Sequence, residues 1–218
     1  MLKLEDTYLH KGKRRALVAE LRAKGIKSER VLDAINNLPR HFFFDSALIS
    51  HAYEDKAFPI GEGQTISQPY TVAFQTELLD VKSGDKILEI GTGSGYQGTI
   101  LHLLGAEVYT IEYQKKLFEG TQRFLKRLGI DLHLFYGDGT GGLPQHAPYD
   151  KIIVTAGAPI VPESLIRQLK VGGILVIPVG DRKRQAMIKI TKKSAKDSIR
   201  EEFDGFSFVP LLGKDGWK

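Results

Sequence analysis

The chain has 218 residues, of which 42% are hydrophobic and 26% are charged, and its formal net charge is +5. This composition is typical of a globular protein, and we expect residues 1–218 to form a single domain. The chain contains no cysteine, which excludes disulfides, thiolate metal ligands and cysteine nucleophiles. No apolar run is long enough to cross a bilayer, and the first residues lack the apolar core of a signal peptide. We therefore expect a cytoplasmic protein without a membrane partner.

The positive charge gathers in two stretches, residues 11–15 and 182–196. Nucleic-acid binding is one interpretation of such stretches, and solvated helix and strand faces are the other. Aromatic side chains that would stack on bases do not alternate with these charges. We therefore do not expect a nucleic-acid partner, and a non-catalytic nucleic-acid-binding module is kept only as an alternative.

The first part of the chain, residues 1–67, predicts two helices followed by an irregular stretch. Helical periodicity covers residues 6–24 and 28–37, and Ser28 is the expected N-cap of the second helix. Residues 40–67 then lack a regular pattern, and a further helical run covers residues 69–79. Long irregular loops in compact domains are often functional, so the stretch before residue 67 is a candidate loop for substrate and cofactor.

The central part, residues 84–180, alternates between strand-like and helical segments. This alternation predicts a parallel sheet covered by helices on both faces. The last part, residues 181–218, instead predicts an antiparallel hairpin and a tail. The expected fold class is α/β, a doubly wound, mostly parallel sheet with N-terminal helices and a C-terminal antiparallel hairpin. The expected strands are 86–90, 107–112, 132–136, 151–155, 174–179, 186–191 and 201–209, and the expected helices are 96–104, 114–128 and 162–169.

The strand over residues 86–90 leads into a turn with glycines at Gly91, Gly93 and Gly95. Glycine permits a tight turn and lets backbone N–H groups approach a ligand at the start of a helix, which suits a nucleotide-like cofactor. Counted from Gly93, the segment also satisfies the dinucleotide pattern G-x-G-x-x-G, so the loop alone does not distinguish the two cofactors. Counted from the strand end, however, the third glycine position is Tyr96, which argues against a dinucleotide.

Three acidic residues extend the candidate cofactor site. Glu112 ends the next strand, where a carboxylate can accept hydrogen bonds from both ribose hydroxyls. Asp138 follows the third strand, where it can accept a hydrogen bond from the adenine amino group. Glu89 adds a negative charge that suits a sulfonium cofactor carrying an ammonium group. A solvated strand end and a simple turn are the alternatives for Glu112 and Asp138, but the order and spacing of the set favour a bound adenosine cofactor.

The segments that carry a resemblance to a known family are GEGQTISQPY at 61–70, ILEIGTGSGYQ at 87–97, GDGTGGLP at 137–144 with YD at 149–150, FVPL at 208–211, PRH at 39–41 and AYED at 52–55. Together they resemble the protein-L-isoaspartate O-methyltransferase family, from residue 28 to residue 212. The resemblance implies a seven-stranded, Rossmann-like sheet of the S-adenosylmethionine-dependent methyltransferase type. It further implies transfer of the methyl group to the free α-carboxylate of L-isoaspartyl residues in damaged proteins or peptides, which initiates repair through a succinimide.

The resemblance also implies roles for single residues. Ser67 lies at the position that the family credits as catalytic, and we expect it to hold one carboxylate oxygen while the other attacks. The carboxylate is already ionised at neutral pH, so no general base is required. An extended substrate backbone is expected to pair with an edge formed by Val209, Pro210 and Leu211. The residues expected to contact the cofactor are Ile60, Gly61, Glu62, Gly63, Gln68, Glu89, Gly91, Gly93, Glu112, Asp138 and Gly139.

Other interpretations of these residues stay open. Without the resemblance, Ser67 predicts the N-cap of the following helix, and residues 209–211 predict an ordinary terminal strand. A related methyltransferase acting on tRNA or on a small molecule is the alternative activity, and it would require residues 57–68 to be only structural. We expect S-adenosyl-L-methionine as cofactor, S-adenosyl-L-homocysteine as product, no metal, isoaspartyl proteins and peptides as partners, and a monomer.

Overall fold

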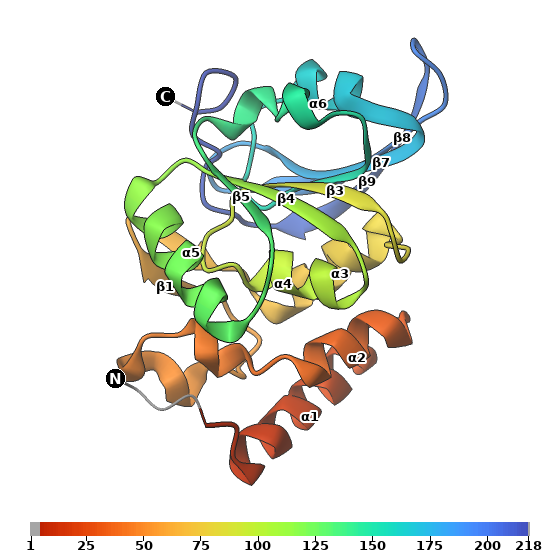
Figure 1. Ribbon diagram of the computed structural model, residues 1–218. Coiled ribbons are helices and arrows are strands. Elements are labelled where there is room, and N and C mark those ends of the chain that lie inside the picture. The colour runs from red at the N-terminus through yellow and green to blue at the C-terminus, as the bar shows by residue number, and fades with distance from the viewer. Residues whose placement is uncertain (1–4, 218) are drawn as a thin grey trace.

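The computed structural model describes residues 5–217, so the predicted domain limits at residues 1 and 218 lie outside the described residues. Figure 1 shows a twisted sheet across the middle of the molecule, with α3, α4 and α5 below it, α6 above it, and α1 and α2 as a separate layer at the bottom. The seven strands follow the order β5-β4-β3-β6-β7-β8-β9. The first five strands in this order are parallel and the last two are antiparallel, as the sequence predicts. The sheet strands are β3 Lys86–Ile90, β4 Glu107–Glu112, β5 His133–Tyr136, β6 Tyr149–Val154, β7 Leu169–Gly180, β8 Gln185–Lys192 and β9 Ser198–Phe206.

The central strands are apolar on both faces because helices cover the sheet from both sides. Ile87, Leu88 and Ile90 of β3 are at most 1% exposed, which is the pattern expected of a parallel strand inside an α/β fold. Ile87 packs in one apolar cluster, on the side of the N-terminal helices, and Leu88 packs in the other. The helices are α1 Tyr8–Ala23, α2 Glu29–Asn37, α3 Pro69–Leu79, α4 Tyr96–Leu103, α5 Lys115–Leu128 and α6 Glu163–Gln168, with short 3-10 helices η1 Arg40–Phe43, η2 Ser46–His51, η3 Gly139–Gly141 and η4 Pro144–His146.

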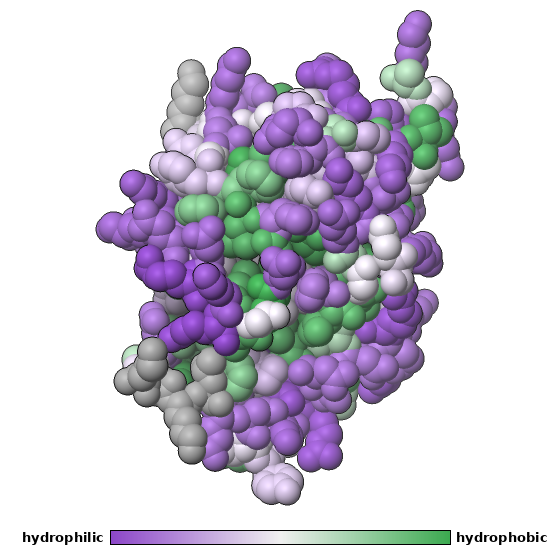
Figure 2. All heavy atoms as spheres, viewed as in Figure 1, coloured by the Kyte–Doolittle hydropathy of each residue, from purple (hydrophilic) through white to green (hydrophobic). Residues whose placement is uncertain are grey.

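The two N-terminal helices form where the sequence predicts them. The Ser28 hydroxyl accepts a hydrogen bond from the Val31 N–H, which confirms Ser28 as the N-cap of α2. Arg30 donates to the carbonyls of Val81 and Leu104 and so ties α2 to the chain that follows α3 and α4. Figure 2 shows that polar side chains cover most of the periphery in this view, while apolar side chains show through near its middle.

Residues 40–67 are more regular than predicted, since η1 and η2 are followed by a hairpin of β1 Phe58–Gly61 and β2 Gln64–Ile66. The hairpin turns through Gly61, Glu62 and Gly63, whose φ angles of 93°, 50° and 70° are all left-handed. The helix that follows matches its predicted bounds, but the prediction that Ser67 is its N-cap is wrong. Gln68 is the N-cap, because Pro69 forces the residue before it into an extended conformation and the helix cannot begin earlier.

The C-terminal strands differ from the prediction at their ends. β7 begins at Leu169, directly after α6, where Leu169 pairs with Tyr149, and its register with β6 then shifts between Tyr149 and Lys151. β9 ends at Phe206, so residues 209–211 lie beyond the hairpin. Among the described residues, no helix combines the length and the apolar character that a membrane span requires.

Candidate active site

A cavity lies at the carboxyl ends of β3, β4 and β6. Because β4 and β5 extend the sheet on one side of β3 while β6 returns on the other, this is where strand order reverses, the usual ligand position in open α/β sheets. Eight of the predicted site residues line the cavity: Ser67, Gly91, Gly93, Glu112, Gly139, Val209, Pro210 and Leu211.

The turn after β3 requires glycine for two reasons. Gly91 has a φ of +98°, and a Cβ atom there would lie 2.6 Å from Oγ1 of Thr155. The Thr155 hydroxyl in turn donates to the Gly91 carbonyl at 2.7 Å, so β6 holds the turn in place. Gly95 has a φ of +83°, and a Cβ there would lie 2.9 Å from Thr121 of α5. The glycine turn is thus a close-fitting cradle between β3, β6 and α5.

Glu112 joins the end of β4 to this turn. Glu112 is 4% exposed, and its carboxylate accepts the Gly93 N–H and the Gln114 N–H, each at 2.8 Å. A carboxylate offers about four lone-pair positions, so two acceptor positions stay available toward the cavity. An acceptor of this kind fits the vicinal hydroxyls of a ribose, and the residues present therefore fit an adenosine cofactor.

Gly139 provides the second close approach. A Cβ atom on Gly139 would lie 2.6 Å from Ile90 Cγ2 and 2.9 Å from Ile111 Cγ2. Only glycine therefore leaves the apolar ends of β3 and β4 open to the cavity at this point. A flat apolar group such as an adenine ring fits a surface of this kind.

Glu89 does not line the cavity, and the expectation that it presents a negative charge there is corrected. Side chains alternate along β3, so Glu89 points away from Leu88 and Ile90, toward Gly98 of α4. It is fully buried, and its Oε2 accepts the Thr110 hydroxyl at 2.6 Å. Desolvation by this burial raises the pKa of Glu89 to about 8. The carboxyl group is therefore mostly neutral at pH 7.

Asp138 also lies outside the cavity lining. Its Oδ1 accepts the N–H and the hydroxyl of Thr140, and its Oδ2 accepts the Lys214 N–H at 2.7 Å. Partial burial opposes ionisation, but the hydrogen bonds from Lys214 and Thr140 prevail and lower the pKa of Asp138. The predicted adenine acceptor thus holds the C-terminal loop against η3.

The predicted loop residues of the hairpin face a second cavity. Ile60, Gly61 and Glu62 line a space of about 730 Å³ between the hairpin, η1 and α5. Glu62 Oε1 forms an ion pair with Lys116 of α5 at 3.0 Å. Gly63 lies at the hairpin tip and lines neither cavity.

Ser67 and the tail segment line the cavity from outside the sheet. Ser67 lies between β2 and α3, and its carbonyl accepts a hydrogen bond from Arg40 Nη2 at 3.0 Å. Gly157 pairs with the tail, donating to the Val209 carbonyl and accepting from the Leu211 N–H, both at 2.8 Å. This occupies one side of the segment. On the opposite side, Pro210 offers a carbonyl and no N–H, because proline has no N–H to donate.

Several residues of the lining were not predicted. Gln64 and Thr65 belong to the segment that carried the family resemblance, so their position in it was the available signal. Thr155 had no such signal, because only the order of strands in the sheet brings the end of β6 beside Gly91. Gln68 was predicted to contact the cofactor, but its side chain donates to Asp55 at 3.1 Å and does not line the cavity.

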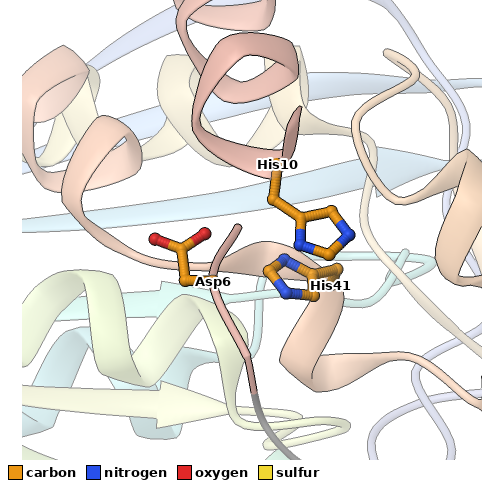
Figure 3. Close-up of side chains that lie close together, drawn as sticks. All are labelled: Asp6, His10 and His41. Carbon is orange, nitrogen blue, oxygen red and sulfur yellow. The ribbon is translucent and has the colours of Figure 1, made fainter. Parts of the chain in front are cut away.

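Asp6, His10 and His41 form a separate cluster of groups that could ligate a metal (Figure 3). The two imidazole rings are stacked with centroids 3.8 Å apart. Asp6 accepts two hydrogen bonds of 3.0 Å from Arg14, and His41 Nδ1 is 2.7 Å from the Tyr53 hydroxyl. These protein contacts account for the cluster, and the adjacent guanidinium group opposes a bound cation.

Comparison with known proteins agrees with this geometry. A family model described as protein-L-isoaspartate(D-aspartate) O-methyltransferase matches residues 12–216. A protein-L-isoaspartate O-methyltransferase of Cytophaga hutchinsonii is 59% identical over 98% of this chain and 97% of the relative. One from Dictyoglomus thermophilum is 50% identical over 98% of this chain and 97% of the relative.

Two solved structures are similar as well. One is a protein-L-isoaspartate O-methyltransferase with a TM-score of 0.83 and 32% identity, matched over 93% of this chain and 66% of that chain. The other, a putative enzyme of this kind from Plasmodium falciparum in complex with S-adenosyl-L-homocysteine, has a TM-score of 0.79 and 25% identity over 91% of this chain and 98% of that chain. With its sheet order, its glycine turn and these relatives, the chain belongs to the protein-L-isoaspartate(D-aspartate) O-methyltransferase family.

Proposed function

We propose that the cavity at the ends of β3, β4 and β6 is the site at which this chain methylates isoaspartyl residues. The chain is an S-adenosylmethionine-dependent protein-L-isoaspartate O-methyltransferase, which methylates the free α-carboxylate of L-isoaspartyl residues and so initiates their repair. One observation carries the placement of the reaction. Ser67, Gly93 and Glu112 come from three distant parts of the chain and line one cavity.

The cofactor would be held by the glycine turn, Glu112 and Gly139. When bound, it supplies a methyl group on a sulfonium, which a nucleophile can take without further activation. The free lone pairs of Glu112 would accept the ribose hydroxyls, and the open surface at Gly139 would receive the adenine. Asp138 lies beside Gly139 and accepts three hydrogen bonds, so one lone-pair position of its Oδ2 would be left for the adenine amino group.

The acceptor needs orientation and no proton transfer. A carboxylate is ionised at pH 7, so no residue has to act as general base. We assign to the Ser67 hydroxyl the task of donating a hydrogen bond to one carboxylate oxygen, which leaves the other oxygen to attack in line. The Pro210 carbonyl would accept a backbone N–H of an extended substrate, which depends little on substrate sequence.

Methyl transfer to paired peptides tests this proposal. We expect label from methyl-labelled cofactor to enter an isoaspartyl peptide as a base-labile ester that releases methanol, and not to enter the matched aspartyl peptide. Ser67→Ala should lower kcat by about 10- to 150-fold, because a hydrogen bond to a charged group contributes about 1.5–3 kcal/mol. Cofactor affinity, measured by calorimetry, should stay unchanged. Equal labelling of both peptides would overturn the substrate assignment, and an unchanged kcat would overturn the role of Ser67.

The predictions of a monomeric enzyme and of a cytoplasmic location remain predictions. Sedimentation of the purified chain over a range of concentrations tests the first of them.

A further inference from the structure

The hydroxyl of Ser67 is held in place only indirectly. Within residues 5–217, no side chain or backbone group forms a hydrogen bond with this hydroxyl, and the hydrogen bond that Ser67 makes to Arg40 is at its carbonyl. Ser67 also lies outside regular structure, between the end of β2 and the N-cap of α3. The direction of its hydroxyl therefore depends on how the short connection from Ser67 to Tyr70 is fixed.

A buried arginine fixes the first end of this connection. Arg40 is 0% exposed, and it donates from Nε to the Ala52 carbonyl at 2.9 Å and from Nη2 to the Ser67 carbonyl at 3.0 Å. Its guanidinium carbon lies 4.9 Å from the centre of the Tyr96 ring, which lines the cavity. No carboxylate of the described chain forms an ion pair with Arg40 by direct contact. Burying a cation is unfavourable without compensation, and here the two carbonyls, the rings of Tyr96 and Phe44 and the nearby charge of Asp55 supply it.

A buried aspartate fixes the second end. The Asp55 side chain is 4% exposed, and its Oδ1 accepts the Tyr70 N–H at 2.7 Å. Tyr70 lies in the first turn of α3, where N–H groups have no partner within the helix. The other oxygen, Oδ2, accepts from the Gln68 side chain at 3.1 Å and from Lys24 at 2.6 Å. Asp55 thus anchors the start of α3 from outside the helix.

We propose that Arg40 and Asp55 are positioning residues that together set the place of the Ser67 hydroxyl. Both come from the segment between α2 and β1, and their hydrogen bonds reach the two ends of the connection from Ser67 to Tyr70, at the Ser67 carbonyl and at Gln68 and Tyr70. Neither lines the cavity, so they act through the backbone. A displacement of about 1 Å at a reacting group can lower the rate by about 100-fold, so holding this connection matters for turnover. The inference rests on the proposed role of Ser67.

The chain offers a matched control for each residue. Arg30 also bridges two backbone carbonyls, those of Val81 at 2.8 Å and Leu104 at 3.0 Å, but neither residue lines the cavity. Asp150 also accepts a backbone N–H, from Lys86 at 2.9 Å, and a lysine ammonium, from Lys170 at 2.8 Å. It lies near the amino-terminal end of β6, whereas the cavity lies at the carboxyl-terminal ends of the strands. The control variants are Arg30→Lys and Asp150→Asn.

The experiment is a set of double-mutant cycles with Ser67→Ala. Arg40→Lys and Asp55→Asn are each expected to lower kcat by about 10- to 100-fold in the wild-type background, with less than about a twofold change in cofactor Kd. In the Ser67→Ala background the same changes should alter kcat by less than about threefold, because interacting residues are not additive. The two control variants should keep kcat within about twofold in both backgrounds.

Each outcome separates the inference from the proposed function. If Ser67→Ala alone leaves kcat unchanged, the assigned role of Ser67 fails. If Ser67→Ala lowers kcat but Arg40→Lys and Asp55→Asn lower it equally in both backgrounds, the positioning role is overturned while the role of Ser67 stands. Circular dichroism and thermal melting monitor folding, and if Arg40→Lys does not fold, the Asp55→Asn cycle decides by itself.

Discussion

The buried carboxyl group of Glu89 should make the stability of this protein depend on pH in a specific direction. Its pKa is raised from the ordinary value of 4.5 to about 8, chiefly by desolvation. The fold therefore favours the protonated form. The stability that Glu89 contributes is complete below pH 4.5 and is lost as the pH rises toward 8, with little further change above that value.

The size of the effect follows from the shift. One pKa unit corresponds to about 1.4 kcal/mol, so the full range from pH 4.5 to 8 amounts to about 5 kcal/mol of unfolding free energy. Glu89→Gln keeps the shape of the protonated carboxyl group and cannot ionise. We expect the unfolding free energy of the variant to show no such loss. The difference in unfolding free energy between the variant and the wild type should therefore change in favour of the variant as the pH rises, whatever that difference is at low pH.

Urea unfolding of both proteins at half-unit steps from pH 5 to pH 9 measures the difference. Titrations of all other groups are shared and cancel when the two curves are subtracted. The hydrogen bond from Thr110 favours the ionised form, so Thr110→Val should leave the onset of the loss near pH 4.5 and extend the loss to higher pH. A difference between wild type and Glu89→Gln that stays constant over the whole range would refute the reasoning.

Four further substitutions have defined outcomes. Glu112→Gln replaces an acceptor of two backbone N–H groups and should weaken cofactor binding by about 10- to 150-fold; unchanged affinity by calorimetry would exclude Glu112 from the ribose site. Gly91→Ala places a Cβ 2.6 Å from a threonine oxygen at a φ of +98° and should lower the free energy of unfolding by at least about 1–3 kcal/mol. Gly120→Ala, in open space within α5, should instead raise it by about 0.5–1 kcal/mol, and urea melts that fail to separate the two would contradict this. Asp138→Ala should release the C-terminal loop, and Trp217, the single tryptophan of the chain, should report this by a red-shifted fluorescence spectrum, whereas an unchanged spectrum would show that the loop is held otherwise.

Local sequence determined most of the secondary structure of this protein. The bounds of Lys86–Ile90, Glu107–Glu112 and Pro69–Leu79 were predicted to the residue, because apolar runs, a strand-ending glycine and a helix-starting proline act within a few residues of themselves. The glycine turn and Glu112 were predicted as cofactor groups for the same reason, since both depend on one strand and the turn after it.

Contacts between distant segments were decided only by the tertiary structure. Asp138 bonds to Lys214, 76 residues further along the chain, and Arg40 bonds to Ser67, 27 residues further along. No local pattern signals such pairs, because they depend on where the tail and the segment before the hairpin cross the sheet edge. Glu89 illustrates the same limit, since a glutamate near a glycine turn suggests a charge toward the ligand, while its burial beneath α4 is set by strand alternation and helix packing together. The sequence by itself therefore specified the cofactor motif and the reaction family, and the packing of remote segments decided which side chains reach the cavity and which hold those side chains in place.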